Sequence, residues 1–311
     1  MKPVAMLTHS ACLAHDTGPF HPENAARLQA VWQGLEGEQF AALLRERARP
    51  ATDEEMALAH PARYVQALMA TVLNPGTHKY VDGDTLMSAG TTEAVRCQAG
   101  AAIGAVDAVM EGWAGAAFAA VRPPGHHAER NRSMGFCFVN GAALAALHAR
   151  ARWGLRRVAV VDFDVHHGNG TQDIAFQDAD FLYVSSHQSP CFPGTGFASE
   201  QGVADNIVNM PLPPGTDGPA FRAAWLGTGL PALRAFAPDL IVISAGFDAH
   251  RADPLADFRL ETADFGWITD QIMTIADACC GGRVVSILEG GYDPDALAGS
   301  AALHVQRLMR Q

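Results

Sequence analysis

A stretch in the middle of the chain carries side chains that could bind a metal ion. Residues 157–172 read RVAVVDFDVHHGNGTQ, where a short apolar run with β-branched residues ends in Asp162, Asp164 and His166. This pattern is typical of a buried parallel strand that delivers polar residues at its carboxyl end. Alternate strand residues point the same way, so Asp164 and His166 can reach one point. A carboxylate and an imidazole form half of a divalent-metal site, and this mixture of donors suits zinc.

Polar clusters also follow three other apolar runs. His126 and His127 follow one, Asp248 follows another, and residues 289–292 (EGGY) follow a third. Ligands of open α/β sheets bind at the carboxyl ends of the strands. Asp248 is therefore the natural third ligand, and two aspartates with one histidine leave coordination positions free, as a catalytic zinc site requires. A lone aspartate here could instead cap a helix, but the coincidence of the clusters favours a ligand.

Two histidines and a tyrosine in these clusters could handle protons. Adjacent His126 and His127 can divide proton work beside a metal-bound water, because imidazole titrates near neutral pH. Each needs an acceptor behind its far nitrogen, and Asp162 and Asn169 are the nearest candidates. Tyr292 could donate a hydrogen bond to a carbonyl oxygen that becomes an oxyanion. The plainer alternatives are that both histidines are ligands or ordinary loop residues and that the tyrosine only packs.

The elements that must position these residues alternate along the chain. Strands are predicted at 4–7, 118–121, 158–161, 181–185, 240–244 and 283–288. Helices are predicted at 23–35, 90–111, 141–153, 218–236, 261–278 and 294–309, with two short helices within 53–73 and mostly loop over 186–216. This alternation implies parallel crossovers, hence an α/β fold with an open, mostly parallel sheet and helices on both faces. No repeat or linker interrupts residues 1–311, which we interpret as a single domain.

The composition argues against several classes of partner. The 311 residues include 22 Lys and Arg against 33 Asp and Glu, for a net charge of −11. Nucleic-acid binding needs a basic face, so we expect no nucleic-acid partner. The acidity could attract cationic substrates, although solubility alone also explains it. Six cysteines without CxxC spacing, no signal-peptide pattern and no long apolar run predict a cytoplasmic protein without a membrane partner.

Seven motifs then occur in a recognisable order across nearly the whole chain. They are HDTGPFHPENAARL at 15–28, RPPGHHAE at 122–129, GFCFVN at 135–140, VDFDVHHGNGTQ at 161–172, FPGTG at 192–196, SAGFDAHRADPL at 244–255 and LEGGY at 288–292. On these motifs the chain resembles the zinc-dependent histone deacetylase family and the related acetylpolyamine amidohydrolases. The resemblance implies the arginase/deacetylase fold.

The resemblance also implies two metal sites. Asp164, His166 and Asp248 match the family's zinc ligands. Family members additionally bind potassium near the zinc, and Asp162, Asp164, His166 and Ser185 match one such site. The expected cofactors are therefore Zn²⁺ and K⁺.

The motif matches imply catalytic roles as well. His127 would be the general base and acid, and His126 would be its electrostatic partner, paired with Asp162. Tyr292 would polarise the substrate carbonyl. Asn169 stands where some members carry aspartate, a pattern that looks like the class II branch. An amide lacks the negative charge of a carboxylate, so the pKa of His127 should be raised less than in aspartate-bearing relatives.

Five further residues are expected to contact substrate. Phe136 and Phe192 lie in glycine-rich loops, where facing rings could wall a channel for an aliphatic chain or merely anchor the loops. The resemblance places them, with Gly135, around an acyl-lysine channel. It makes Asp84 the rim aspartate that holds substrate backbone amides. Leu255 stands where polyamine-preferring members have glutamate, which favours a lysine-like or plain acyl chain.

The expected function is that of a zinc-dependent amidohydrolase, a deacetylase that removes acetyl or related acyl groups from lysine side chains or similar primary amines. Its partner would be an acylated lysine peptide or a small acyl-amine, and an oligomer is left open. The alternatives are an acetylpolyamine or small-metabolite amide deacetylase, a ureohydrolase-like enzyme with two manganese ions, and a non-catalytic acyl-lysine binding protein. The ureohydrolase reading needs extra bridging carboxylates, yet Asp248 is followed by Ala249, His250 and Arg251.

Overall fold

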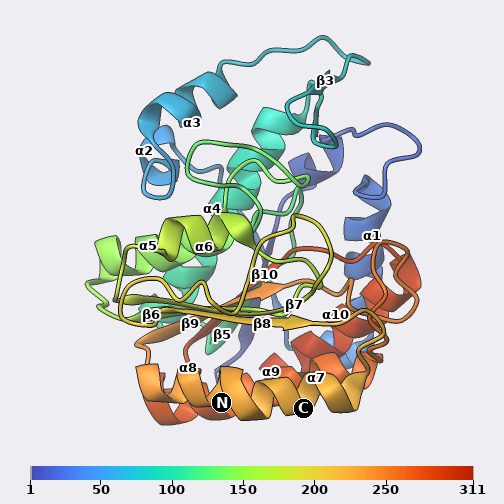
Figure 1. The fold of residues 1–311 in the computed structure, drawn as a ribbon. Coiled ribbons are helices and arrows are strands. Elements are labelled where there is room, and N and C mark those ends of the chain that lie inside the picture. The colour runs from blue at the N-terminus through green and yellow to red at the C-terminus, as the bar shows by residue number, and fades with distance from the viewer. Residues whose placement is uncertain (1, 311) are drawn as a thin grey trace.

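The computed structural model describes residues 2–310 and has one eight-stranded sheet at its centre (Figure 1). The strand order is β2-β1-β5-β10-β9-β6-β7-β8, and every neighbouring pair is parallel. The strands are β1 (Val4–Thr8), β2 (Leu44–Arg47), β5 (Ala116–Ala119), β6 (Val158–Asp162), β7 (Phe181–Gln188), β8 (Ile207–Leu212), β9 (Leu240–Ala245) and β10 (Val284–Leu288). Two short strands, β3 (Lys79–Tyr80) and β4 (Leu86–Met87), pair antiparallel outside this sheet. The expectation of an open parallel α/β sheet is confirmed.

Helices cover both faces of the sheet (Figure 1). One face carries α4 (Thr91–Glu111), α5 (Gly141–Trp153) and α6 (Asn169–Ala175). The other carries α8 (Leu230–Phe236), α9 (Thr262–Cys280) and α10 (Pro294–Leu308), and α1 (Ala25–Gly34) packs on α10. The remaining helices are α2 (Asp53–Met56), α3 (Ala62–Met69), α7 (Gly218–Ala224), the 3₁₀ turns η1 (Ser10–Ala14) and η2 (Glu38–Phe40), and the π-helical η3 (Trp225–Gly229). The central strands β5, β6, β9 and β10 are buried along their whole length and mostly apolar, as expected for a parallel sheet that is covered on both faces.

Small residues let α4 pack closely against its neighbours. A Cβ atom at Gly100 would lie 1.7 Å from the carbonyl oxygen of Arg49, and one at Gly104 would lie 2.7 Å from Leu7 Cδ2. Such distances are far inside van der Waals contact, so glycine is required at Gly100. The Ala and Gly content of this helix therefore reflects core packing, as its sequence predicted.

The prediction of mostly loop over 186–216 is wrong in two places. Strand β7 continues to Gln188, and β8 forms the edge of the sheet at Ile207–Leu212. The missed part of β7 is polar although it is buried, and β8 contains Asn209 and Pro211, so neither shows an apolar run. Strand β2 at the opposite edge was also not predicted, because its four side chains are exposed. Edge strands carry a weak sequence pattern since only part of their surface is covered.

A continuous apolar core runs along both faces of the sheet and includes residues from β1 through to α10. Within residues 2–310, no helix combines the length and apolar character needed to cross a membrane.

Candidate active site

Three side chains at the ends of two neighbouring strands converge on one point. Asp164 and His166 follow β6, and Asp248 follows β9, which pairs with β6. One ligand atom from each residue lies within 4.8 Å of the others, and all three residues are buried. His166 Nδ1 lies 3.2 Å from Asp164 Oδ1 and 3.0 Å from Asp248 Oδ2. The structure therefore brings the three predicted ligands together.

Backbone groups hold the two carboxylates. The Gly290 N–H donates to Asp164 Oδ2 over 2.9 Å, and the Val165 N–H donates to Asp248 Oδ1 over 2.9 Å. A Cβ atom at Gly246 would lie 2.0 Å from Asp164 Oδ2, and one at Gly290 would lie 2.1 Å from Asp248 Oδ2. Glycine at both positions lets the ends of β9 and β10 approach the carboxylates this closely.

The charge at this point fits a divalent cation. Burial, followed by the negative charge of Asp164, raises the pKa of Asp248 to about 6. Among the described residues, only histidines form ion pairs with these two carboxylates. Buried carboxylates in proteins are paired or coordinate metals. Two carboxylate oxygens and one imidazole nitrogen, with further positions open to a ligand, match a catalytic zinc site, so Asp164, His166 and Asp248 could hold this ion.

Two histidines from the loop after β5 lie beside the ligands. His126 Nε2 is 3.7 Å from Asp164 Oδ2, and the ring centroid of His127 is 6.0 Å from that of His166. The ring centroids of His126 and His127 are 4.0 Å apart. Asp162 Oδ2 accepts a hydrogen bond from His126 Nδ1 over 3.0 Å, and Asn169 Oδ1 accepts one from His127 Nδ1 over 2.9 Å. The two acceptors suggested by the sequence thus lie behind the two histidines.

The surroundings push the pKa values of the two histidines apart. Burial alone lowers the pKa of His126, but the charges of Asp164 and Asp162 outweigh it and raise this pKa to about 10. Burial, followed by positive charge on His126 and His166, lowers the pKa of His127 well below its usual value. At neutral pH His126 carries a charge while His127 is a neutral imidazole that can accept a proton. Such a division is how paired groups take separate acid and base roles.

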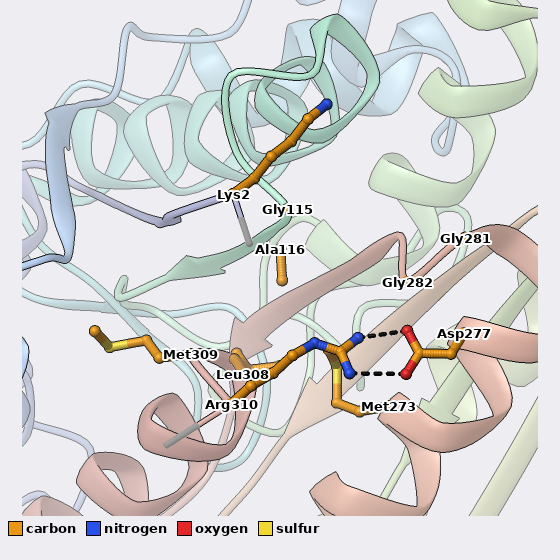
Figure 2. Close-up of a pocket in the computed structure, with 10 residues that line it drawn as sticks. All are labelled: Lys2, Gly115, Ala116, Met273, Asp277, Gly281, Gly282, Leu308, Met309 and Arg310. Carbon is orange, nitrogen blue, oxygen red and sulfur yellow. Dashed lines mark hydrogen bonds and ion pairs between the residues drawn. The ribbon is translucent and has the colours of Figure 1, made fainter.

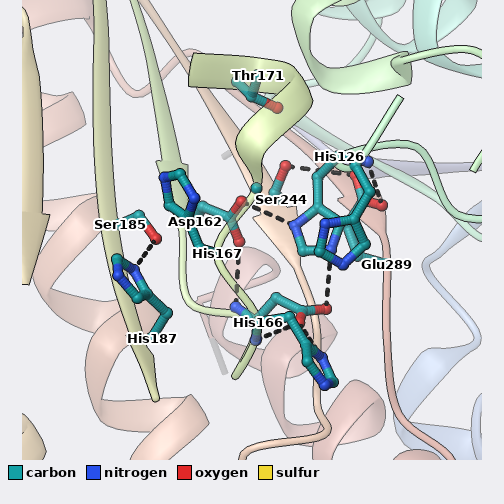
Figure 3. A network of polar contacts seen from close by, with 12 residues as sticks. His126, Asp162, His166, His167, Thr171, Ser185, His187, Ser244 and Glu289 are labelled. Carbon is teal, nitrogen blue, oxygen red and sulfur yellow. Dashed lines mark hydrogen bonds and ion pairs between the residues drawn. The ribbon is translucent and has the colours of Figure 1, made fainter. Parts of the chain in front are cut away.

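We did not predict a role for Glu289 from the sequence. Its Oε2 accepts hydrogen bonds from the backbone N–H groups of Gly125 and His126, at 2.6 and 3.1 Å, and its Oε1 accepts one from Ser244 Oγ at 3.3 Å (Figure 3). Glu289 therefore holds the histidine loop against the end of β10. Its position directly after a buried strand is a sequence feature that could have indicated this role.

Tyr183 was also missed. Its hydroxyl donates to Asp162 over 3.0 Å, but no sequence feature indicates this contact because Tyr183 lies inside an apolar run.

A pocket of about 200 Å³ reaches the metal-ligand cluster. Its aromatic walls include Phe192, whose ring centroid is 5.0 Å from that of His127, and Phe136, whose ring centroid is 5.9 Å from that of Tyr292. Such a lining suits an aliphatic chain. The lining residues include all five that were expected to contact substrate: Asp84, Gly135, Phe136, Phe192 and Leu255, together with His127, His166 and Tyr292.

Tyr292 is fixed from two sides. Its backbone N–H donates to Asp253 Oδ2 over 2.7 Å, and the guanidinium of Arg27 lies 4.7 Å from the centre of its ring. Burial raises the pKa of the phenol well above its usual value of 10, although the charge of Arg27 opposes this shift. The hydroxyl therefore keeps its proton and can act as a hydrogen-bond donor in the pocket.

Ser185 lies on β7 directly opposite Asp162 of β6. Both are buried, and Ser185 Oγ is 3.0 Å from His187 Nδ1 (Figure 3). Burial lowers the pKa of His187 to about 4, so its ring is neutral near pH 7. The structure thus places Ser185 beside one of the residues with which it was expected to bind potassium.

A larger cavity, of about 310 Å³, lies at the other end of the strands from this pocket (Figure 2). It is lined by residues such as Lys2, Ala116 and Gly282 near the amino ends of the strands. Arg310 donates two hydrogen bonds to the carboxylate of Asp277 there, which neutralises both charges. This cavity holds none of the convergent polar groups of the pocket described above.

Comparisons with known proteins agree with this geometry. The protein-family model of the histone deacetylase domain matches residues 21–308 of this chain. The chain belongs to the histone deacetylase family. It is 40% identical to the histone deacetylase-like amidohydrolase of Pseudomonas aeruginosa, covering 87% of this chain and 71% of that protein. It is also 40% identical to a probable deacetylase of Methanothermobacter thermautotrophicus, covering 90% and 83% respectively. The crystal structure of the HDA15 HD domain superimposes with a TM-score of 0.92 at 34% identity, covering 100% of this chain and 89% of that one. The fold of this family member is accordingly the arginase/deacetylase fold.

Proposed function

We propose that this chain is a zinc-dependent amidohydrolase that removes acetyl, or a related acyl group, from the ε-amine of lysine or a similar primary amine. The observation that carries the proposal is the convergence of Asp164, His166 and Asp248 at a pocket also lined by His127 and Tyr292. Membership of a family whose named members include deacetylases and an amidohydrolase supports the reaction class.

The residues of the pocket divide the reaction between them. Zinc held by the two aspartates and His166 would polarise the amide carbonyl and lower the pKa of a water molecule. His127 takes the proton of the attacking water, because its ring is neutral and Asn169 accepts from its Nδ1. Tyr292 donates a hydrogen bond to the carbonyl oxygen as negative charge develops on it. His127, once protonated, delivers the proton to the departing amine, and charged His126 remains paired with Asp162.

The shape of the pocket supports an acyl-lysine or similar substrate. Phe136 and Phe192 contact the methylene chain, and Gly135 leaves room between them. Asp84 at the rim accepts hydrogen bonds from substrate backbone amides. Leu255 offers no negative charge to a second amine of the substrate, so the lysine-like substrate is favoured over a polyamine.

We further propose that Ser185, with Asp162, Asp164 and His166, binds a potassium ion that stabilises the end of β6. We also propose that the protein is cytoplasmic and acts without a nucleic-acid or membrane partner.

The test compares zinc-loaded parent protein with Tyr292→Phe on an acetyl-lysine peptide, measuring released acetate and bound zinc. We expect the variant to keep its zinc and lose roughly 10²-fold or more in turnover, because an oxyanion donor is removed. Tyr80→Phe is the control, since Tyr80 is 66% exposed and does not line the pocket. Equal turnover of parent and Tyr292→Phe contradicts the assignment. Two manganese ions per site would indicate the ureohydrolase-like alternative, and binding of peptide without release of acetate would indicate a non-catalytic binder.

A further inference from the structure

Glu129 lies behind the catalytic pocket and contacts one residue of the histidine network. Its Oε1 accepts a hydrogen bond from Asn169 Nδ2 over 2.8 Å. Among residues 2–310, this amide is the only polar partner of the Glu129 side chain, and no Lys or Arg forms an ion pair with its carboxylate. Glu129 is half-buried and lines a separate cavity of about 570 Å³, on the far side of Asn169 from the substrate pocket.

The chemistry of this contact determines the orientation of the Asn169 amide. An ionised carboxylate only accepts hydrogen bonds, so the NH₂ group of Asn169 must face Glu129 and its oxygen must face His127. The oxygen in turn only accepts, so His127 Nδ1 must carry the proton of the neutral ring. His127 Nε2 is then left with a free electron pair. Met134 Sδ, 3.2 Å from the same Asn169 nitrogen, is too weak an acceptor to impose this orientation alone.

The contact also restores a negative charge that Asn169 itself lacks. A carboxylate directly behind a histidine would favour the protonated ring. Here the carboxylate is one amide further away, and each hydrogen bond of such a chain polarises the next. The developing positive charge on His127 is thus stabilised by Glu129 through Asn169.

We propose that Glu129 is a positioning residue for the deacylation reaction, which sets the tautomer of His127 by holding the Asn169 amide. The inference rests on the proposed function for its effect on rate, but not for its effect on the histidine ring. Glu129 touches neither substrate nor metal ligands, so its loss lowers kcat and leaves KM nearly unchanged.

The chain contains a matched control with the same chemistry. Glu200 lines the same cavity, is also half-buried, and accepts from Gln172 Nε2 over 2.8 Å. Gln172 Oε1 in turn lies 3.0 Å from His167 Nε2. Glu200 also accepts from the Gly196 N–H over 3.2 Å, a contact that the oxygen of a glutamine can keep. His167 does not line the substrate pocket, so Glu200→Gln makes the same change to a carboxylate, an amide and a histidine outside the proposed reaction.

The first experiment measures steady-state kinetics on an acetyl-lysine peptide. Glu129→Gln can hold the amide in either orientation, and we expect its kcat to fall roughly 10-fold, as is typical when a partner behind a functional histidine is lost. Glu200→Gln should retain the parent kcat. Melting temperatures of both variants show whether each is folded.

The second experiment reverses the requirement at position 129. Asn169→Asp places the new carboxylate directly against that of Glu129, so one of the two must take up a proton. The hydrogen bond between residue 169 and His127 is then disturbed. We expect this variant to lose turnover while Glu129 is present. In the double variant Asn169→Asp with Glu129→Gln, the glutamine amide can donate to the new aspartate, and most of the lost turnover should return. If Glu129 has a purely structural role, the double variant should instead show the summed turnover losses of Glu129→Gln and Asn169→Asp.

The third experiment is independent of turnover. Imidazole ¹⁵N spectra of zinc-loaded protein report the tautomer of His127, whose signals are assigned by their loss in His127→Ala. We expect protonated Nδ1 and unprotonated Nε2 in the parent and a mixture in Glu129→Gln. Identical spectra, together with a parent kcat in Glu129→Gln and no recovery in the double variant, overturn the inference. An inactive parent whose spectra still depend on Glu129 refutes the proposed function and supports the positioning role.

Discussion

Substitution of Gly135 tests whether His127 and Phe192 lie as close to its backbone as the structure shows. Its φ of +56° is in the left-handed region, and a Cβ atom there would lie 2.5 Å from His127 Cδ2 and 2.9 Å from Phe192 Cε1. Gly135→Ala therefore has two separate costs. The backbone conformation costs about 1–2 kcal/mol for any residue with a Cβ atom. The clash comes in addition, because ordinary contact begins at 3.4 Å.

The clash sets the expected effect on catalysis. His127 or its loop must retreat by about 1 Å to restore ordinary contact, and a displacement of that size can cost roughly 10² in rate. The methyl group also narrows the pocket beside Phe192, so KM for an acyl-lysine peptide should rise. We expect kcat/KM to fall by roughly 10² or more and the melting temperature to fall by roughly 1–2 °C for each kcal/mol lost, given the length of 311 residues.

The assay compares kinetics and thermal unfolding of Gly135→Ala with those of Gly154→Ala. Gly154 has a φ of +69° at the end of α5, and a Cβ atom there would meet nothing within 4 Å. The control therefore isolates the backbone cost and should melt at a lower temperature while keeping parent kinetics. If Gly135→Ala hydrolyses the peptide as fast as Gly154→Ala does, the pocket does not have the geometry described.

Three further predictions concern the metal, the core and the specificity. Asp248→Asn removes an anionic ligand, and we expect zinc affinity, measured by competition with a chelator, to fall roughly 100-fold or more. Arg122→Met removes the two hydrogen bonds of 2.8 Å that Arg122 donates to buried Glu23 and leaves Arg27 as its ion-pair partner, so the free energy of unfolding at pH 7 should fall by about 3–5 kcal/mol. Burial raises the pKa of Glu23, but the charges of Arg122 and Arg27 outweigh it and lower this pKa below its usual value. The stability that Glu23 contributes is therefore complete above pH 5 and lost as the pH falls, which urea unfolding at pH 7 and pH 4 measures. Leu255→Glu should raise kcat/KM for acetylated polyamines severalfold relative to an acetyl-lysine peptide, because an exposed ion pair contributes about 0.2–1 kcal/mol.

Each of these three has a result that would contradict it. Parent zinc affinity in Asp248→Asn would remove Asp248 from the ligand set. The difference in the free energy of unfolding between pH 7 and pH 4 should be smaller in Arg122→Met than in the parent. An unchanged difference would show that groups other than Glu23 cause the loss of stability in acid. An unchanged substrate ratio in Leu255→Glu would place the second amine of a polyamine away from position 255.

The sequence predicted the interior of the sheet better than its edges. Strands such as β6 and β9 begin with four apolar residues, because both faces of the sheet are covered by helices. The edge strands β2 and β8 gave no such pattern, since β2 is exposed and β8 is only partly buried. The helix boundaries were close because capping residues such as Asn140, which accepts from the Ala143 N–H, are visible in the sequence.

The polar residues at the strand ends could be placed together from the sequence, because parallel strands must present their carboxyl ends at one edge of the sheet. The sequence by itself therefore determined which aspartates, histidines and tyrosine meet. Only the tertiary structure decided how they are held. Glu289 accepts hydrogen bonds from the histidine loop, about 160 residues away in the sequence. Glu129 orients Asn169, which lies 40 residues further along the chain. Such hydrogen bonds depend on where packed helices bring separate loops to within about 3 Å, a distance that no local pattern encodes.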